Sequence, residues 1–310
     1  MYKLLKLNDF RQFKDMDISL GKRLTVLAGR NSTGKSTILG ILANSGELKK
    51  KDGTTYADGQ FRAEFSEIFH GSKKYDASGS DRIQIDIVDE NDDQIDYRKF
   101  RTAWQNDNGK DRFRVIPLKM LEDGKKTEAK MQIPVIYLGL SRLFPIGEAN
   151  EDKITTKKIK FIDDEQKQWF VEQYTQILSL YDTVTDVSNY SIGETDKKKG
   201  VGIETDKYDY LTNSSGQDNL GQILMAILSF KRLKKQREEW TGGLLLIDEI
   251  DATLHPAAQK RLIDLLTKEA KVNDIQVVVT THSSDLLKHI CNKTVHNNIN
   301  KNNPVELYYF

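Results

Sequence analysis

The sequence has little cysteine and no long apolar segment, and both absences exclude classes of protein. Its one cysteine, Cys291, cannot form an internal disulfide, which favours a reducing, cytoplasmic location. The longest uninterrupted apolar run, residues 223–228, is far shorter than the roughly 20 residues that span a bilayer. No basic-then-apolar segment typical of a signal peptide opens the chain. The sequence therefore predicts a soluble protein without a membrane partner.

An excess of charge of either sign is also lacking. Lysine and arginine number 47 against 46 aspartates and glutamates, so the whole chain has no general attraction to nucleic acid or to anionic lipid. Any contact with DNA would have to come from a local basic patch. Two runs are candidates, FKRLKKQR at residues 230–237 and KITTKKIK at residues 153–160. The alternative interpretation is that both runs are solvated protein surface.

The 310 residues are 38% hydrophobic, enough for one large domain or two tightly joined lobes. Apolar strand-like runs alternate with helix-like segments, which predicts an α/β fold with a mostly parallel sheet. Short alternating segments at about 80–120 predict an antiparallel β insertion, and helical spacing predicts a helical lobe at about 150–235. We expect strands near 23–28, 133–140, 243–250 and 275–283, helices near 36–42, 163–181, 219–237 and 256–271, and a loop at 196–202.

The segment LAGRNSTGKST combines two glycines, a lysine and two hydroxyls between a predicted strand and a predicted helix. Gly29, Gly34, Lys35 and Ser36 match the pattern G-x-x-x-x-G-K-[ST] of phosphate-binding loops. In such a loop the backbone N–H groups surround a triphosphate, the lysine contacts the β- and γ-phosphates, and the serine binds Mg²⁺. We therefore predict an ATP and Mg²⁺ site formed by Gly29, Arg30, Asn31, Ser32, Thr33, Gly34, Lys35, Ser36 and Thr37.

Two acids and a histidine follow other apolar strands. Asp248 and Glu249 come directly after LLLI, where two carboxylates are costly unless they hold a metal or a proton. Asp248 is predicted to join Ser36 around Mg²⁺, and Glu249 to accept a proton from the attacking water. His282 ends the run VVVTTH and is predicted to contact the γ-phosphate.

Together these motifs resemble the ATPase heads of the ABC type, in the branch that includes RecF, SMC proteins and the overcoming-lysogenization-defect (OLD) ATPases. The segment TNSSGQ is similar to the signature motif of that family, with Ser215, Gly216 and Gln217 at its centre. The segment DEIDATLHP is similar to the corresponding segment of SMC and OLD proteins. The resemblance implies that the signature residues lie at a helix N-terminus and complete the nucleotide site of a second subunit, in a homodimer that encloses ATP.

The chain also departs from this family. The strand at 133–138 is followed by Ser141 and Arg142 rather than by the glutamine of the family's Q-loop, so Arg142, a water molecule or Gln60 would have to replace it. The segment between Arg142 and Ser215 is too short for the long arms of SMC proteins. Only 28 residues follow His282, so the Toprim domain of OLD nucleases is missing from this chain. Either the chain is truncated or its effector is a separate polypeptide.

The resemblance implies an ATP-hydrolysing head that dimerises around ATP and controls a DNA-directed process, such as phage defence or DNA repair, through an effector nuclease or toxin. A nucleotide-gated scaffold or sensor with little turnover is the alternative. A transporter ATPase ranks lower, because the Q-loop that normally faces a membrane partner is altered.

Overall fold

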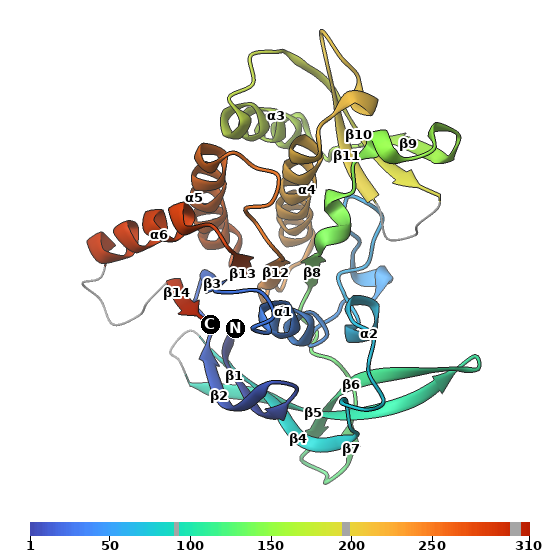
Figure 1. Ribbon diagram of the computed structural model, residues 1–310, viewed down its shortest axis with the longest axis vertical. Coiled ribbons are helices and arrows are strands. Elements are labelled where there is room, and N and C mark those ends of the chain that lie inside the picture. The colour runs from blue at the N-terminus through green and yellow to red at the C-terminus, as the bar shows by residue number, and fades with distance from the viewer. Residues whose placement is uncertain (90–92, 194–198, 298–304) are drawn as a thin grey trace.

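A five-stranded parallel sheet forms the centre of the molecule (Figure 1). The computed structural model describes residues 1–89, 93–193, 199–297 and 305–310. The strands of this core sheet follow the order β14-β3-β13-β12-β8 and all neighbours are parallel. They are β3 (Leu24–Ala28), β8 (Val135–Leu138), β12 (Gly243–Ile247), β13 (Ile275–Thr281) and β14 (Val305–Tyr309). The predicted α/β fold of P-loop NTPases is confirmed.

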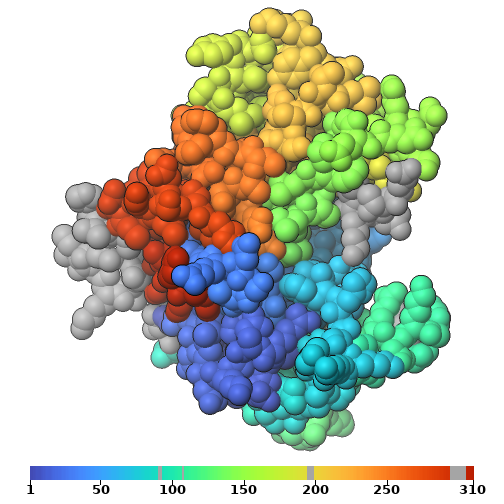
Figure 2. Space-filling view, in the orientation of Figure 1, coloured from blue at the N-terminus to red at the C-terminus, as the bar shows by residue number. Residues whose placement is uncertain are grey.

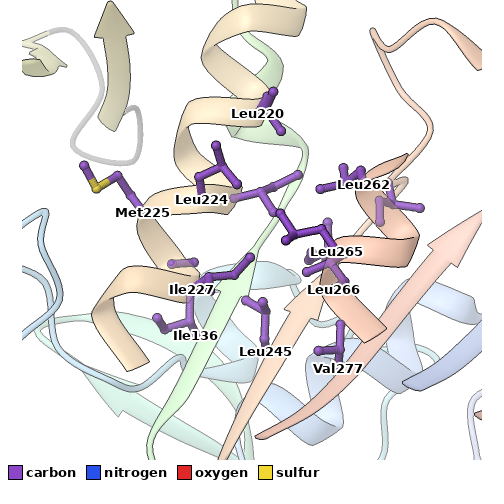
Figure 3. Close-up of a cluster of buried hydrophobic side chains, with 14 of the residues drawn as sticks. Ile136, Leu220, Leu224, Met225, Ile227, Leu245, Leu262, Leu265, Leu266 and Val277 are labelled. Carbon is purple, nitrogen blue, oxygen red and sulfur yellow. The ribbon is translucent and has the colours of Figure 1, made fainter. Parts of the chain in front are cut away.

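Helices cover both faces of the core sheet, which explains why its strands are continuous apolar runs. In β12, Leu245 and Ile247 belong to one buried cluster, whereas Leu244 and Leu246 belong to another on the opposite face. Figure 3 shows the first cluster, in which side chains of β8, β12 and β13 meet those of α4 and α5. The longer helices are α1 (Lys35–Ala43), α3 (Asp164–Leu178), α4 (Ser215–Gln236), α5 (Pro256–Asn273) and α6 (Ser284–Asn297).

A six-stranded antiparallel sheet covers the other side of α1. The predicted insertion is β4, β5 and β6, but these strands also pair with the N-terminal hairpin, giving the order β2-β1-β4-β5-β6-β7. Its apolar face and α1 share the second buried cluster, with α2 (Phe65–Ile68) at its edge. The strands are β1 (Tyr2–Phe10), β2 (Phe13–Ser19), β4 (Gly79–Val88), β5 (Gln94–Asp107), β6 (Lys110–Met120) and β7 (Lys126–Thr127).

The region 150–235 holds α3 and α4, as predicted, and also a three-stranded antiparallel sheet that was not predicted. Its strands, in the order β11-β10-β9, are β9 (Ile154–Lys158), β10 (Val184–Ile192) and β11 (Lys199–Thr205). The predicted loop at 196–202 is therefore wrong for residues 199–202, while 196–198 lie outside the described residues. The glycines of this segment suggested a loop. In the structure, Gly200 lies in a strand and makes room for a neighbouring side chain, because a Cβ atom there would lie 2.0 Å from the ring of Tyr190 on β10.

The first and last parts of the chain meet in the core sheet. β3 lies between β13 and β14, and the backbone N–H of Phe310 donates to the carbonyl of Ala28 at 2.9 Å. Figure 2 shows the same arrangement on the surface, where blue N-terminal and red C-terminal segments adjoin near the centre of the view. Within the described ranges, none of the helices has the length and apolar character needed to cross a membrane.

Candidate active site

The loop between β3 and α1 has the tight turns that its glycines allow. Gly29 and Gly34 have φ angles of 135° and 93°, and Ser32 is also left-handed at 63°. At Gly29 a Cβ atom would lie 2.2 Å from the carbonyl oxygen of Phe310, so only glycine fits there. The loop leads into the N-terminus of α1, where unpaired backbone N–H groups and the helix dipole favour an anion. Residues 29–37 thus have a backbone suited to binding phosphate.

Lys35 is buried at the first position of α1 and its ammonium group turns back into the loop. Its Nζ donates to the carbonyl oxygens of Gly29 at 3.1 Å and Arg30 at 2.6 Å. Burial lowers the pKa of Lys35, and the nearby carboxylates of Asp248 and Glu249 oppose that shift. The ammonium group therefore lies where the loop and the two acids converge.

The two residues predicted to bind Mg²⁺ lie next to each other. The Ser36 hydroxyl donates to Oδ1 of Asp248 at 3.1 Å, and the same oxygen accepts a bond from the Thr280 hydroxyl at 2.6 Å. Asp248 is only 4% exposed, and hydroxyl groups rather than charged side chains donate these two hydrogen bonds to it. A hydroxyl and a carboxylate are the hard oxygen ligands that Mg²⁺ prefers, and Mg²⁺ commonly keeps waters and substrate phosphates as its other ligands. The donor set therefore fits Mg²⁺.

The predicted catalytic residues open into the same cavity as the loop. This cavity has a volume of about 320 Å³ and is lined by residues 31–37 together with Asp248, Glu249 and His282. Glu249 has a left-handed backbone, with φ of 47°, and its N–H donates to the Thr280 hydroxyl at 2.7 Å. His282 is exposed, and its N–H donates to Asp251 at 3.3 Å. The structure thus gathers four kinds of chemical group around one cavity: an ammonium, a hydroxyl, two carboxylates and an imidazole.

Neither candidate for the missing Q-loop glutamine lines this cavity. Arg142 lies in the one-turn 3-10 helix Leu140–Leu143 and is 3% exposed, with its guanidinium group bonded to protein acceptors. Gln60 and Arg142 both line a second cavity, of about 230 Å³, between β8, α4 and the three-stranded sheet. A direct contact with the nucleotide is therefore not supported for either side chain.

The signature residues lie at the N-terminus of α4, which begins at Ser215, four residues before its predicted start. Ser214 caps the helix: its hydroxyl accepts a hydrogen bond from the backbone N–H of Gln217. The Gln217 side chain in turn accepts one from the backbone N–H of Ser214. The segment is thus a serine-capped helix start with a capping box. A Cβ atom on Gly216 would lie 2.5 Å from the carbonyl oxygen of Thr253. Ser214, Gly216 and Gln217 line a separate cavity of about 370 Å³ and not the loop cavity.

Three residues that line the loop cavity were not predicted from the sequence. Gln12 lies in the turn between β1 and β2, and Phe69 is the C-cap of α2. No local pattern marks either residue, because each reaches the loop through tertiary packing. Thr280 could have been identified from the sequence, since a threonine near the end of a valine-rich strand offers a hydroxyl beside the acids of the neighbouring strand.

The sequence model of the AAA ATPase domain family matches residues 1–95 and 125–287, well over half of the chain. An uncharacterized protein of Methanocaldococcus jannaschii, MJECL11, is 44% identical over 46 residues, and the match covers 15% of this chain and 40% of that protein. The chain thus spans less than half of the length of this relative.

Among solved structures, the SMC head domain from Thermotoga maritima is 14% identical, with a TM-score of 0.45. The Smc head domain bound to the C-terminal domain of ScpA from Pyrococcus furiosus is 15% identical, with a TM-score of 0.47. Each comparison covers 93% of this chain and 91% of the other chain. The identification depends on the family match and on the loop geometry: the chain belongs to the family of AAA ATPase domains.

Proposed function

We propose that this chain binds ATP with Mg²⁺ and hydrolyses it. The observation that carries the proposal is the single cavity lined by Lys35, Ser36, Asp248 and Glu249. A triphosphate on the loop would place its terminal phosphate near the Lys35 ammonium, as the pattern of phosphate-binding loops requires. The cavity volume of about 320 Å³ lies within the range of small-molecule sites.

Each group has a distinct role in this proposal. Ser36 and Asp248 would hold Mg²⁺, which supplies positive charge to the phosphate oxygens when it is bound. Glu249 orients a water molecule and accepts its proton, and His282 donates a hydrogen bond toward the terminal phosphate. The Thr280 hydroxyl donates to the carboxylate of Asp248 and accepts from the backbone N–H of Glu249. It therefore fixes the spacing between the two acids.

The finer proposal is that two copies enclose two ATP molecules. The signature residues Gly216 and Gln217 and the loop residues 31–37 line different cavities of one chain, and a second copy can bring one to the other. A two-fold axis would then repeat the contact, so two nucleotides become part of the interface. Nucleotide that binds only the paired state stabilises the pair by linkage.

The proposed process, control of a DNA-directed event such as phage defence or repair through an effector nuclease or toxin, is supported by the resemblance of the motifs. The two basic runs do not support direct DNA binding. Lys231 pairs with Glu269, Lys234 with Asp274 and Lys235 with Asp163. In the other run, Lys157 pairs with Asp58 and Lys158 with Asp186. These ion pairs offset part of the charge that contacts to a phosphate backbone would use.

Lys35→Ala tests the proposal. We expect the affinity for ATP to fall by about 10- to 100-fold, because a hydrogen bond to a charged group contributes about 1.5–3 kcal/mol. Isothermal titration calorimetry with Mg²⁺ present measures this change. Lys130→Ala is a matched control, since Lys130 is also buried but bonds to Glu64 and the Ala63 carbonyl, away from the loop cavity. Equal ATP affinity in wild type and Lys35→Ala would contradict the proposed site.

A further inference from the structure

Arg142 occupies the place after β8 where the resemblance leads one to expect a glutamine, and it makes an unusual set of contacts. Its Nη1 donates to the carbonyl oxygens of Leu138 at 3.1 Å and Gly139 at 2.9 Å, at the end of β8. Its Nη2 donates to the carbonyl oxygen of Glu249 at 3.0 Å, and its Nε to Oδ1 of Asn219 at 2.8 Å. One planar group therefore joins β8, the acidic turn and α4.

Burial makes this arrangement rigid. Arg142 is 3% exposed, and burial lowers its pKa to about 10 while Asp248 and Glu249 oppose that shift. The guanidinium group is therefore still charged near neutral pH. A buried charge whose donors are bonded to fixed backbone oxygens resists displacement, since each lost bond would leave a charged group unpaired.

These contacts hold the backbone of Glu249 on both sides of its Cα atom. Its N–H donates to the hydroxyl of Thr280 at 2.7 Å, and its carbonyl accepts from Arg142. With φ of 47°, Glu249 has a backbone conformation that a non-glycine residue adopts at a cost of about 1–3 kcal/mol. The direction of its side chain thus depends on these two neighbours.

Asn219 extends the connection to the signature segment. It lies on α4 one turn after Ser215 and is completely buried. Its Nδ2 donates to the carbonyl of Ala252 at 3.0 Å, while its Oδ1 accepts from Arg142. Asn219 therefore bonds both to the turn that follows Glu249 and to the arginine that holds Glu249. Gly216 touches this turn as well, because its missing Cβ leaves room for the Thr253 carbonyl.

We propose that Arg142 and Asn219 are positioning residues that hold Glu249 in its catalytic orientation and link that orientation to the first turn of α4. If the nucleotide of a second copy displaces the first turn of α4, the displacement reaches Glu249 through two consecutive hydrogen bonds. The first joins Asn219 to Arg142, and the second joins Arg142 to the Glu249 carbonyl. The ATPase would then respond to contact at Ser215 without any group of α4 entering its own loop cavity. This inference rests on the proposed role of Glu249 as the base.

Asn219→Ala is the variant that tests the link, because it removes one side chain of the pair and leaves Arg142 in place. We expect kcat for ATP hydrolysis to fall by about 10²-fold, the usual effect of misplacing a catalytic group by about 1 Å. ATP affinity should stay unchanged, since the loop and Lys35 are not touched. Hydrogen–deuterium exchange of a peptide spanning residues 245–258 should become faster, because the turn after Glu249 loses a bond.

Two further variants separate positioning from general loss of stability. Asn273→Ala removes another buried asparagine, whose Nδ2 donates to Glu269 within α5, and it should change neither kcat nor exchange at 245–258. Asn219→Ala combined with Glu249→Gln should be no slower than Glu249→Gln alone, since the asparagine acts through the glutamate. Arg142→Lys, which keeps the charge but not the planar fork, should reproduce the kcat loss of Asn219→Ala.

The outcomes distinguish this inference from the proposed function. Wild type that neither binds nor hydrolyses ATP contradicts the proposed function, and the exchange measurement alone then decides whether Asn219 holds the Glu249 turn. If wild type hydrolyses ATP but Asn219→Ala keeps its kcat, or if its exchange at 245–258 equals that of wild type, the inference is overturned. The inference is also overturned if the rate losses of Asn219→Ala and Glu249→Gln multiply in the double variant.

Discussion

Glu249→Gln should leave the fold and ATP affinity intact and lower the rate of ATP hydrolysis by about 10²- to 10⁴-fold, the usual contribution of a positioned general base. The amide has the shape of the carboxylate but cannot accept a proton from water. The backbone of residue 249 is held by Thr280 and Arg142 rather than by its own side chain, so the substitution should not move the turn. Single-turnover hydrolysis of radiolabelled ATP at saturating protein measures the chemical step without product release.

The control for this substitution is another glutamate. Glu172→Gln changes an exposed side chain on α3 whose carboxylate accepts a bond from Gln168, and it should leave turnover as it is. Calorimetric ATP binding and thermal unfolding of both variants would show that the protein is still folded. If Glu249→Gln turns over ATP near the wild-type rate, another group is the base.

Each part of the site that was predictable from the sequence is contained in one short segment. Residues 29–37 carry their own turn chemistry, with glycine at two positions of positive φ, and the next residues begin a helix. Asp248 and Glu249 were identifiable because two acids follow a strand that is buried on both faces. The order of strands and helices was predictable for a similar reason, since the continuous apolar runs of β12 and β13 are typical of a parallel sheet covered on both sides.

The remaining parts depend on contacts between residues far apart in the sequence. Arg142 and Asn219 are separated by 77 residues, and nothing in either local segment indicates the other. The antiparallel strands at 154–158 and 199–205 were missed because the first is short and holds two lysines, and the two glycines of the second suggest a loop. Their pairing partner, β10, supplies the cross-strand contacts that make them strands.

The structure also decides which substitution can test the proposed dimer. Gly216 is the obvious signature residue to change, but any side chain there would press on the Thr253 carbonyl of its own chain. That clash would disturb the turn after Glu249, and the loss of activity would not report on a second copy. Ser215 is the better choice, because it is the first residue of α4 and only half-buried. An arginine at this position extends away from the helix and blocks an approaching nucleotide.

Mixing a Lys35→Ala chain with a Ser215→Arg chain should restore ATPase activity that neither variant has alone. In a pair that shares its sites, one composite site combines the intact loop of one chain with the intact signature residues of the other. Random pairing of equal amounts gives heterodimers in half of the pairs, each with one good site, so we expect about a quarter of the wild-type rate. Steady-state ATP turnover across a titration of one variant into the other measures the recovery.

The matched control replaces the Ser215→Arg chain by the double variant Lys35→Ala, Ser215→Arg, which leaves every loop in the mixture without its lysine. This mixture should stay inactive, and any activity in it would come from a contaminant. ATP should also shift wild type toward the dimer in sedimentation experiments, because nucleotide at an interface favours association by linkage. The shift should persist in Glu249→Gln, which binds ATP but does not remove it, so its dimer should last longer than that of wild type. Absence of recovery in proven heterodimers, or full activity in a stable monomer, would show that Ser215 does not act on the nucleotide of a second copy.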